Sequence, residues 1–443
     1  MSKVRTGFSV RTGVPSVALF AVLAACGGAP DGDGAPPCDG PSGTLCLFMG
    51  TTGRPGLGHD GVPPHEVRLY LPQDLDFGPD GRPYVVDWNN HRIRTLDADG
   101  LVQTYIGTGE LGIGAPGPVG DVRLNHPTHV AFGPTGDLFL AAWHNSKVLS
   151  VRKGGATVEV VCGTGARSYS GDGGPPLEAA LDLPVATVHD SEGRLYIMDQ
   201  ANQRIRRIED GIINTALGPP GDWLPDGTRR VCVANDNGQE VCDKVCKAEE
   251  ADDGERCAAQ TVPRPWGFAG DGGAARDLRI YLPFGQSAPP SGRMAMGPDD
   301  VLYIADTGNH VVRAVDLRRE GEAGAVSTVA GTPPAEFSED LLGGYGGDGG
   351  PATAALLNRP NDVAVAADGT LYIADTRNSC VRVVAPDGTI ATLAGVCGTR
   401  GSDGLGGPAS EALLDRPYGV AIGPEGHVYI ADTHNQRIVV VRK

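Results

Sequence analysis

The sequence predicts an all-β protein, a six-bladed β-propeller built from four-stranded antiparallel blades. Three observations support this fold class: a phrase that recurs six times, short β-rich runs separated by turn residues, and complementary ends of the chain. The 443 residues include 66 Gly and 35 Pro, which suit many tight turns and short strands better than long helices. One large repeat assembly therefore explains a chain of this length.

The recurring phrase is LYIADTGNH from Leu302, LYIADTRNS from Leu371 and VYIADTHNQ from Val428. Successive copies lie about 55 residues apart, except where the third copy carries an insertion of about 50 residues and the fourth a smaller one. Six copies align, and the position of the aspartate is occupied by Asp87, Ala142, Asp199, Asp306, Asp375 and Asp432.

Each copy predicts four short strands. In RPYGVAIGPEGHVYIADTHNQRIVVV, from Arg416, apolar runs alternate with GPEG and DTHN turns, a pattern typical of consecutive hairpins. Such units, joined by Gly-rich connectors, describe propeller blades. The sixth copy stops at Lys443 after its third strand, and residues 43–53 match the missing fourth strand. We therefore expect the N-terminal strand to complete the last blade and close the ring.

The segments RPNDVAVAADGTLYIADTRN and RPYGVAIGPEGHVYIADTHNQRI resemble the NHL repeat, and the connectors resemble those of secreted bacterial NHL-repeat proteins. The resemblance covers roughly residues 43–443. It implies the same six-bladed fold but no single function, because this architecture carries both enzymes and binding scaffolds.

The N-terminus resembles a bacterial lipoprotein signal. Lys3, Arg5 and Arg11 precede an apolar run at 14–22, and an LAAC box ends at Cys26. The resemblance implies that residues 1–25 are removed and that Cys26 is lipidated. The protein is then expected to be exported, either as an outer-membrane lipoprotein on the periplasmic or cell-surface side or to another extracytoplasmic location. Residues 26–43 are then a Gly/Pro-rich tether, and residues 44–443 the propeller. An ordinary signal peptide or an uncleaved anchor are alternatives, although the apolar run is too short to span a bilayer.

The net charge indicates which partners are disfavoured, and the cysteine content indicates the redox compartment. The formal net charge of −17 disfavours nucleic acid. Ten cysteines fit an oxidising compartment. The disulfide candidates are Cys380 with Cys397, which flank a predicted strand pair, and two local bridges among Cys232, Cys242, Cys246 and Cys257. At least one of Cys38, Cys46 and Cys162 is then a free thiol.

We interpret the recurring aspartate as structural, because a catalytic residue is needed at one place whereas this phrase recurs around the ring. The aspartate is expected to accept backbone N–H groups of the residues that follow it. The asparagine three residues later is expected to adopt the left-handed conformation of the turn. The GDGG connectors, with Asp172, Asp271 and Asp348, each offer one acid, which is too few oxygens for calcium.

Candidate ligand-binding residues lie where the repeat varies, at the innermost start of the first strand of each blade. They are Asp74, His129, Arg293, Asn361, Asp362 and Tyr418. Asp74, Asn361 and Asp362 resemble part of the set that holds a divalent ion in gluconolactonase-like propellers, with Arg293 and Tyr418 contacting a substrate. A divalent metal is thus the one cofactor considered, and no catalytic residue is assigned. Asp74 can orient the His129 imidazole from the adjacent blade. The alternative is a solvated rim without a specific ligand.

Two further features stand out. The cysteine-rich insertion at about 219–266, in blade three, is a candidate cap or partner surface. In blade two, Ala142 replaces the aspartate while Trp143 and His144 appear, so we expect any specialised sector there. His189 is expected to be a hydrogen-bonded core residue.

The expected function is that of an exported, lipid-anchored binding or interaction scaffold for a protein or small polar ligand at the channel face. The protein is expected to be monomeric and to touch the membrane only through its N-terminal lipid. The alternative function is a metal-dependent lyase or lactone hydrolase that acts in the central channel. A structural envelope protein without a specific ligand is a third hypothesis.

Overall fold

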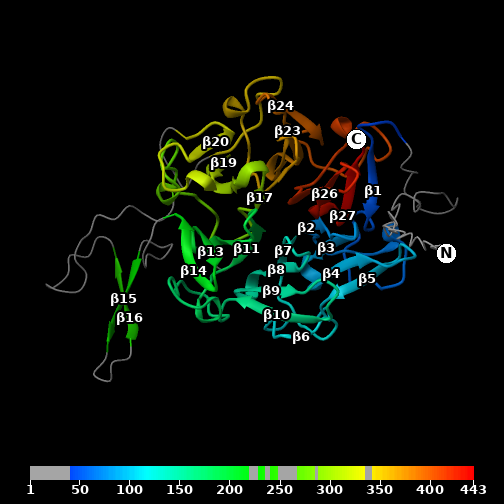
Figure 1. Ribbon diagram of the computed structural model, residues 1–443. Coiled ribbons are helices and arrows are strands. Elements are labelled where there is room, and N and C mark those ends of the chain that lie inside the picture. The colour runs from blue at the N-terminus through cyan, green and yellow to red at the C-terminus, as the bar shows by residue number, and fades with distance from the viewer. Residues whose placement is uncertain (1–39, 219–227, 235–239, 248–266, 285–287, 335–341) are drawn as a thin grey trace, which may run out of the picture.

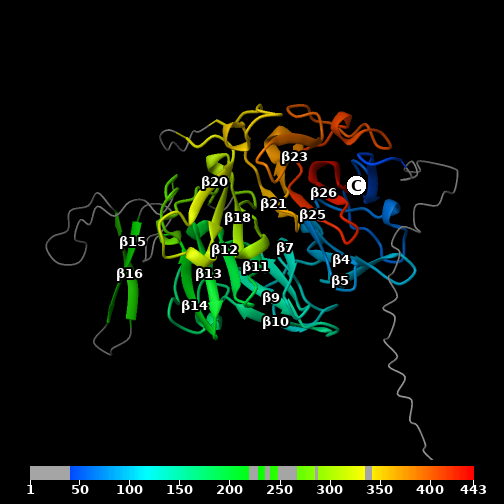
Figure 2. The same cartoon turned by 45° about the horizontal axis from the view of Figure 1, so that its top comes forward.

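The computed structural model describes residues 40–443 except 219–227, 235–239, 248–266, 285–287 and 335–341. Within the described residues, six four-stranded antiparallel sheets stand around a central axis as the blades of a propeller (Figure 1). The view turned by 45° shows the same ring of blades, from blue through red, around that axis (Figure 2). The predicted fold class is therefore confirmed.

The strands of each blade are called a to d from the channel outwards. Blade one contains β2 (Asp74–Phe77), β3 (Pro83–Asp87), β4 (Arg92–Leu96) and β5 (Val102–Ile106). Blade two contains β7 (Pro127–Phe132), β8 (Leu138–Ala142), β9 (Lys147–Val151) and β10 (Thr157–Cys162), with β6 (Gly117–Pro118) at the outer edge. Blade three contains β11 (Pro184–His189), β12 (Leu195–Asp199), β13 (Arg204–Glu209) and β14 (Ile212–Leu217). Blade four contains β17 (Met294–Met296), β18 (Val301–Asp306), β19 (Val311–Asp316) and β20 (Val326–Ala330). Blade five contains β21 (Asp362–Val365), β22 (Leu371–Asp375), β23 (Cys380–Val384) and β24 (Ile390–Ala394). Blade six contains β25 (Gly419–Ile422), β26 (Val428–Asp432), β27 (Arg437–Val441) and β1 (Leu45–Met49).

The helices of the described residues are all short 3-10 turns. One set follows strand b: η3 (Trp88–Asn90), η4 (Trp143–Asn145), η6 (Gln200–Asn202), η9 (Thr307–Asn309), η12 (Thr376–Asn378) and η14 (Thr433–Asn435). A second set lies in the connectors and other loops: η2 (Pro64–Glu66), η5 (Pro176–Glu178), η7 (Ala275–Asp277), η8 (Pro298–Asp300), η10 (Leu317–Arg319), η11 (Ala352–Ala354) and η13 (Ala409–Glu411). In this part of the chain, no helix has the length and apolar character needed to cross a membrane.

The ring closes through the two ends of the chain. Strand β1 pairs antiparallel with β27, with Leu45 opposite Val441 and Met49 opposite Ile438. It thus supplies strand d of blade six and covers an edge that would otherwise be exposed. This pairing agrees with the closure expected from the sequence.

A glycine follows strand d in every blade and adopts a positive φ. An added Cβ at Gly107 would lie 2.4 Å from the carbonyl oxygen of His91, and one at Gly331 would lie 2.6 Å from that of His310. The chain can therefore leave strand d this close to strand c only without a side chain. The glycines in this position are Gly50, Gly107, Gly163, Gly218, Gly331 and Gly395.

The recurring aspartate is structural, but its contacts differ from those expected. Asp306 is fully buried and accepts the N–H of Tyr281, in the connector, at 2.9 Å. It also accepts the side-chain amide of Asn309 at 2.9 Å and makes no cap hydrogen bond to the turn that follows. The expectation that it bonds the next backbone N–H groups was therefore wrong, because the carboxylate points back to the connector.

The recurring asparagine fastens the same connector. Its side-chain amide donates to a connector carbonyl at 2.7 to 3.0 Å in all six blades, and the acceptors are Gly56, Gly112, Ser168, Gly267, Gly344 and Gly401. The left-handed residue of the turn is the next one, as at His310 with φ 59°. The asparagine thus stabilises a contact with a distant connector and does not itself adopt the left-handed conformation of the turn.

That left-handed residue joins each blade to the next in five of six cases. His310 Nδ1 accepts the N–H of Arg359 at 2.9 Å, and Gln436 Oε1 accepts that of Leu71 at 2.7 Å. The other acceptors are His91, Gln203 and Ser379. The repeated phrase therefore holds a hairpin, a connector and a neighbouring blade together.

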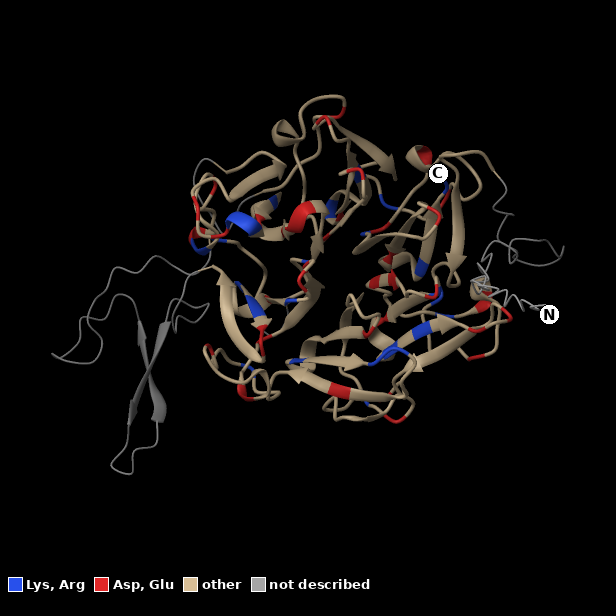
Figure 3. Cartoon of the chain, viewed as in Figure 1, with Lys and Arg blue, Asp and Glu red and all other residues tan. Residues whose placement is uncertain are grey.

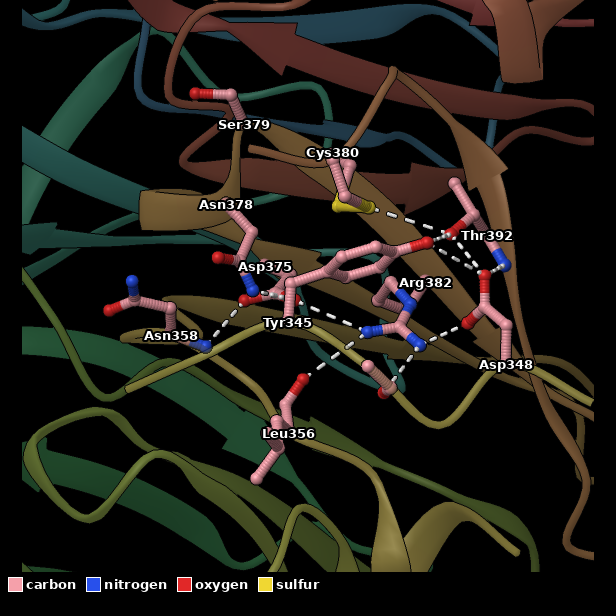
Figure 4. Close-up of a disulfide and its surroundings, with 12 residues drawn as sticks. Tyr345, Asp348, Leu356, Asn358, Asp375, Asn378, Ser379, Cys380, Arg382 and Thr392 are labelled. Carbon is pink, nitrogen blue, oxygen red and sulfur yellow. Dashed lines mark hydrogen bonds and ion pairs between the residues drawn. A yellow bond between two sulfur atoms is a disulfide. The ribbon is translucent and has the colours of Figure 1, made fainter. Parts of the chain in front are cut away.

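A fully buried arginine on strand c pairs with two aspartates in four blades. In blade five, Arg382 lies 3.5 Å from Asp375 of the phrase and also bonds Asp348 of the GDGG connector, with the Tyr345 ring beside its guanidinium (Figure 4). Arg94, Arg206 and Arg313 repeat the arrangement with Asp60, Asp172 and Asp271 at 2.9, 2.6 and 2.7 Å. The connector acids are therefore the partners of buried arginines.

The apolar core lies between adjacent blades. One cluster joins Val86 of blade one to Leu140 and Leu149 of blade two, and strands β3, β12 and β22 are buried along their whole length. Asp and Glu residues occur on every blade rather than on one (Figure 3). The acidic surface thus surrounds the ring.

The predicted disulfide between Cys380 and Cys397 is present. Cys162 is a buried free thiol, which fulfils the expectation of at least one, and Cys46 is disulfide-bonded. Strands β15 (Thr228–Ala234) and β16 (Glu240–Lys247) of the insertion form a separate two-stranded sheet. The side chains of Cys232, Cys242, Cys246 and Cys257, and also Cys26 and Cys38, lie outside the described residues.

Candidate functional site

The central channel is formed by strand a of each blade, because every one of these strands contacts the strand a of both neighbouring blades. All six predicted site residues lie within the first three residues of these strands or directly before them. The site residues of different blades therefore meet at one level of the ring.

Arg293 closes the channel at that level. It comes from blade four, is fully buried, and donates to the carbonyl oxygens of Gln73 at 2.9 Å, Tyr418 at 2.6 Å and Thr128 at 2.8 Å. These acceptors belong to blades one, six and two, so the guanidinium lies across the axis. Its fixed fork of donors suits this role, which a lysine would fill less well.

Two carboxylates beside Arg293 tie neighbouring blades together. Asp74 accepts the N–H of Val130 at 3.1 Å, and Asp362 accepts that of Val420 at 2.9 Å. Burial raises the pKa of Asp74 to about 6 and that of Asp362 to about 7, although the Arg293 charge acts in the opposite direction. An Asp362 oxygen lies 4.0 Å from the guanidinium.

The predicted pair of Asp74 and His129 is brought together at the channel. His129 Nε2 lies 4.0 Å from Asp74 Oδ2, which is beyond hydrogen-bond distance, and its Nδ1 accepts the N–H of Thr187 at 3.4 Å. Burial, with help from the Arg293 charge, lowers the pKa of His129 to about 3. His129 is therefore a neutral imidazole whose proton sits on Nε2.

Asn361 and Tyr418 belong to the same closed level. The Asn361 side chain donates to the Tyr418 carbonyl at 3.3 Å, and its own carbonyl accepts the N–H of Arg293 at 3.1 Å. The Tyr418 ring is half-buried and stacks on His434, with ring centroids 6.3 Å apart. Both residues thus support the arginine through the backbone.

A cavity of about 310 Å³ lies along strand a of the blades, lined by Asp74, Asp76, His129, His189 and Asp362 among apolar residues. Asp76 was missed from the sequence, although its place two residues after Asp74 puts both side chains on one face of the strand. Burial, together with the Asp74 charge, raises the pKa of Asp76 to about 7. His189 lines the same cavity, and its buried Nδ1 has no hydrogen-bond partner, so the expectation of a hydrogen-bonded core residue was wrong.

The channel residues do not fit a divalent metal. Among the described residues, no group of three or more His, Cys, Asp or Glu side chains is arranged to hold a metal ion. The Asp74 and Asp362 oxygens already accept backbone N–H groups, and the Arg293 cation stands beside them. A second cation would meet occupied lone pairs and a like charge.

Comparison with known proteins identifies the repeat. The NHL repeat model matches residues 357–384 and 414–441. Teneurin-m of Drosophila melanogaster is 26% identical over 405 residues, 84% of this chain and 12% of that protein. Protein SUPPRESSOR OF QUENCHING 1, chloroplastic, of Arabidopsis thaliana is 28% identical over 278 residues, 59% of this chain and 25% of that protein. This chain thus spans a small part of the length of these relatives.

A solved structure has the same fold. The auxiliary nutrient binding protein of Bacteroides ovatus has a TM-score of 0.54 and 16% identity, and the match covers 90% of this chain and 76% of that one. At this identity the likeness concerns the fold alone. The two matched repeats, the four further copies of the phrase and the six closed blades show that the chain contains NHL repeats and folds as a six-bladed β-propeller.

Proposed function

We propose that this protein is an exported binding scaffold that takes a small polar ligand into its central channel. The observation that carries the proposal is a cavity of about 310 Å³ along the inner strands, next to the level at which Arg293 crosses the channel. Concave sites with a few convergent polar groups are the usual form of small-molecule sites.

The cavity wall supports a polar ligand. Asp76 bonds the N–H of Phe77 within its own strand, at 2.7 Å, so part of its carboxylate faces the cavity. His129 Nε2–H has no acceptor within hydrogen-bond distance in the described residues, since the Asp74 oxygen is 4.0 Å away. The wall thus offers an acceptor and a donor to a ligand.

The alternative function, a metal-dependent lyase or lactone hydrolase, has less support. It requires lone pairs that converge on one cation, whereas the channel oxygens are hydrogen-bonded to backbone N–H groups beside Arg293. Metal content of the purified protein separates the two. A stoichiometric divalent ion that is lost in Asp74→Asn would favour the enzyme.

Export and lipid anchoring are part of the same proposal. The disulfide between Cys380 and Cys397 supports an extracytoplasmic location, and the fold resembles a protein named as nutrient-binding. The proposed division of the chain is a signal at 1–25, a tether at 26–43 and a propeller at 44–443. Mass spectrometry of the N-terminal peptide from membranes should find lipid on Cys26, and Cys26→Ser should release the protein into the soluble fraction.

The ligand test is a thermal-shift screen of the propeller against small cationic, neutral and anionic polar compounds, followed by calorimetry of the hits. We expect at least one hit whose affinity falls in Asp76→Asn and is unchanged in Asp80→Asn. Asp80 is the matched control because it lies on the same blade but is exposed and paired with Arg82 at 2.6 Å. A screen without hits, or equal affinity in both variants, would refute a channel ligand.

A further inference from the structure

Two histidines face each other between blades one and two, outside the channel. His126 lies directly before strand β7, and His144 lies in the turn η4 of the same blade. Their Nδ1 atoms are 3.1 Å apart, and Asn125 Oδ1 is 2.7 Å from the Nδ1 of His126. Two atoms that can each carry a lone pair, one nitrogen and one oxygen, therefore lie close to the Nδ1 of His126.

The position of the proton on the His126 ring decides whether its Nδ1 offers a lone pair. His126 Nε2 lies 3.1 Å from Asn89 Oδ1 and its Nδ1 lies 2.7 Å from Asn125 Oδ1, so each ring nitrogen has an oxygen acceptor, and one of the two tautomers has the ring proton on Nε2. A neutral His126 ring carries one proton, which that tautomer places on Nε2. Its Nδ1 then presents a lone pair to His144 and Asn125, an arrangement that a bound cation would stabilise.

We propose that His126 Nδ1, His144 Nδ1 and Asn125 Oδ1 bind a divalent transition-metal ion, Zn²⁺ or Cu²⁺, with water in the remaining positions. Ligand atoms bound at about 2.0–2.1 Å to one ion lie roughly 3 Å from each other. The separations of 3.1 and 2.7 Å match that spacing. Neutral imidazoles are the ligands that both ions favour.

The surroundings orient both rings. The Trp143 indole is buried, stacks on His144 at 4.1 Å, and is itself held by Gln200 at 3.1 Å. Asn89 Oδ1 lies 3.1 Å from His126 Nε2, where it can accept a ring proton, which is the usual role of a group behind a metal-bound histidine. Both histidines are only half-buried, so an ion can reach them.

Neither the neighbouring His91 nor the neighbouring Arg167 prevents a cation from binding between His126 and His144. His91 Nδ1 is occupied by the backbone N–H of His126, at 3.2 Å, and serves to fix that residue. The Arg167 charge acts on His144, but Arg167 is paired with Asp182 at 2.7 Å, which offsets its repulsion of a cation.

The arrangement is specific to blade two. His434 occupies the same turn position in blade six, between Thr433 and Asn435, as His144 does in blade two. The residue that corresponds to His126 in blade six is Arg416, which also has a positive φ. His434 therefore faces a cation where His144 faces an imidazole, and it makes a matched control.

Calorimetric titration of the untagged protein, first with Zn²⁺ and then with Cu²⁺, tests the proposal. We expect one site that is lost in His144→Ala, retained in His434→Ala and weakened about 10- to 100-fold in Asn89→Ala. The electron paramagnetic resonance spectrum of bound Cu²⁺ should show coupling to two nitrogens. Because His144 is half-buried in a surface turn, we expect metal-free His144→Ala to melt within a few degrees of the parent, which controls for folding.

Absence of binding, or equal loss in His144→Ala and His434→Ala, would overturn the assignment. So would a Cu²⁺ spectrum without nitrogen coupling. The site is independent of the channel, so loss of metal binding in His144→Ala should leave any channel ligand unaffected.

Discussion

Replacing Asp76 with Asn removes a carboxylate whose ionised form destabilises the folded protein. Asp76 stands in the channel cavity with Asp74 and Asp362, and burial and their charges raise its pKa from 3.8 to about 7. The amide keeps the oxygen that accepts the N–H of Phe77 at 2.7 Å. The variant thus changes charge with little change in shape.

The sign of the effect follows from the direction of the shift. Because the folded pKa lies above the unfolded one, the protonated carboxylate contributes fully below pH 3.8, and this contribution is lost as the pH rises through about 7. The difference between these two values corresponds to about 4 kcal/mol at most. Asp76 is partly exposed to solvent, so we expect Asp76→Asn to stabilise the protein by roughly 2 kcal/mol at pH 8.

Urea denaturation of both proteins, measured from pH 4 to pH 8, checks this prediction. The free energy of unfolding of the variant should exceed that of the parent at pH 8, and the difference should shrink towards pH 4. A difference that is independent of pH would show that Asp76 ionises as freely in the folded chain as in the unfolded one. The channel would then be more hydrated than its geometry indicates.

Three further substitutions test the ring. Arg293→Met leaves three buried carbonyls without a donor, and urea denaturation should show a loss of about 3–5 kcal/mol. Asn378→Ala releases the connector carbonyl of Gly344, so we expect faster hydrogen exchange in residues 344–350 and a loss of about 1–2 kcal/mol. Cys380→Ser opens a bridge across 17 residues, which should lower the free energy of unfolding by about 3 kcal/mol. Unchanged stability in any variant would contradict the role given to that residue.

The sequence predicted the fold because the repeat makes local pattern and global architecture agree. Six copies of the phrase predicted six blades, and the ends of the chain predicted the pairing of β1 with β27. The contacts of the aspartate and asparagine were not predicted, since their partners lie in connectors far along the chain, such as Gly267 for Asn309. Turn chemistry is local in sequence, whereas these hydrogen bonds depend on tertiary packing.

The sequence predicted the position of the channel residues but not what each side chain does. Arg293 was expected to contact a substrate, and it instead bonds carbonyls of three other blades, which requires knowledge of the ring diameter. Asp76 could have been found from the period of two along a strand. The departure of blade two from the phrase did point to His144, whereas its contact with His126 depends on how the connector before β7 packs against the turn η4.

The buried arginines explain which copies of the repeat can vary. The connector position four residues after the carbonyl bonded by the recurring asparagine changes together with a strand-c position in all six blades. The pairs are Asp60 with Arg94, Pro116 with Leu149, Asp172 with Arg206, Asp271 with Arg313, Asp348 with Arg382, and Leu405 with Val439. An unpaired charge at the buried strand-c position would cost several kcal/mol, so both members are charged or both are apolar.

Blade six keeps Asp432 because Arg437 replaces the missing partner at 2.8 Å. Blade two has lost the phrase aspartate as well, and there Asn145 Oδ1 accepts the connector N–H of Asn125 at 2.9 Å in its place. Without these ion pairs, blade two holds its connector through the Asn145 side chain and through Lys147, which donates to the carbonyl oxygen of Ile113 at 3.0 Å. Its turn can therefore carry Trp143 and His144 without loss of the scaffold, and a sector with its own chemistry is compatible with the ring.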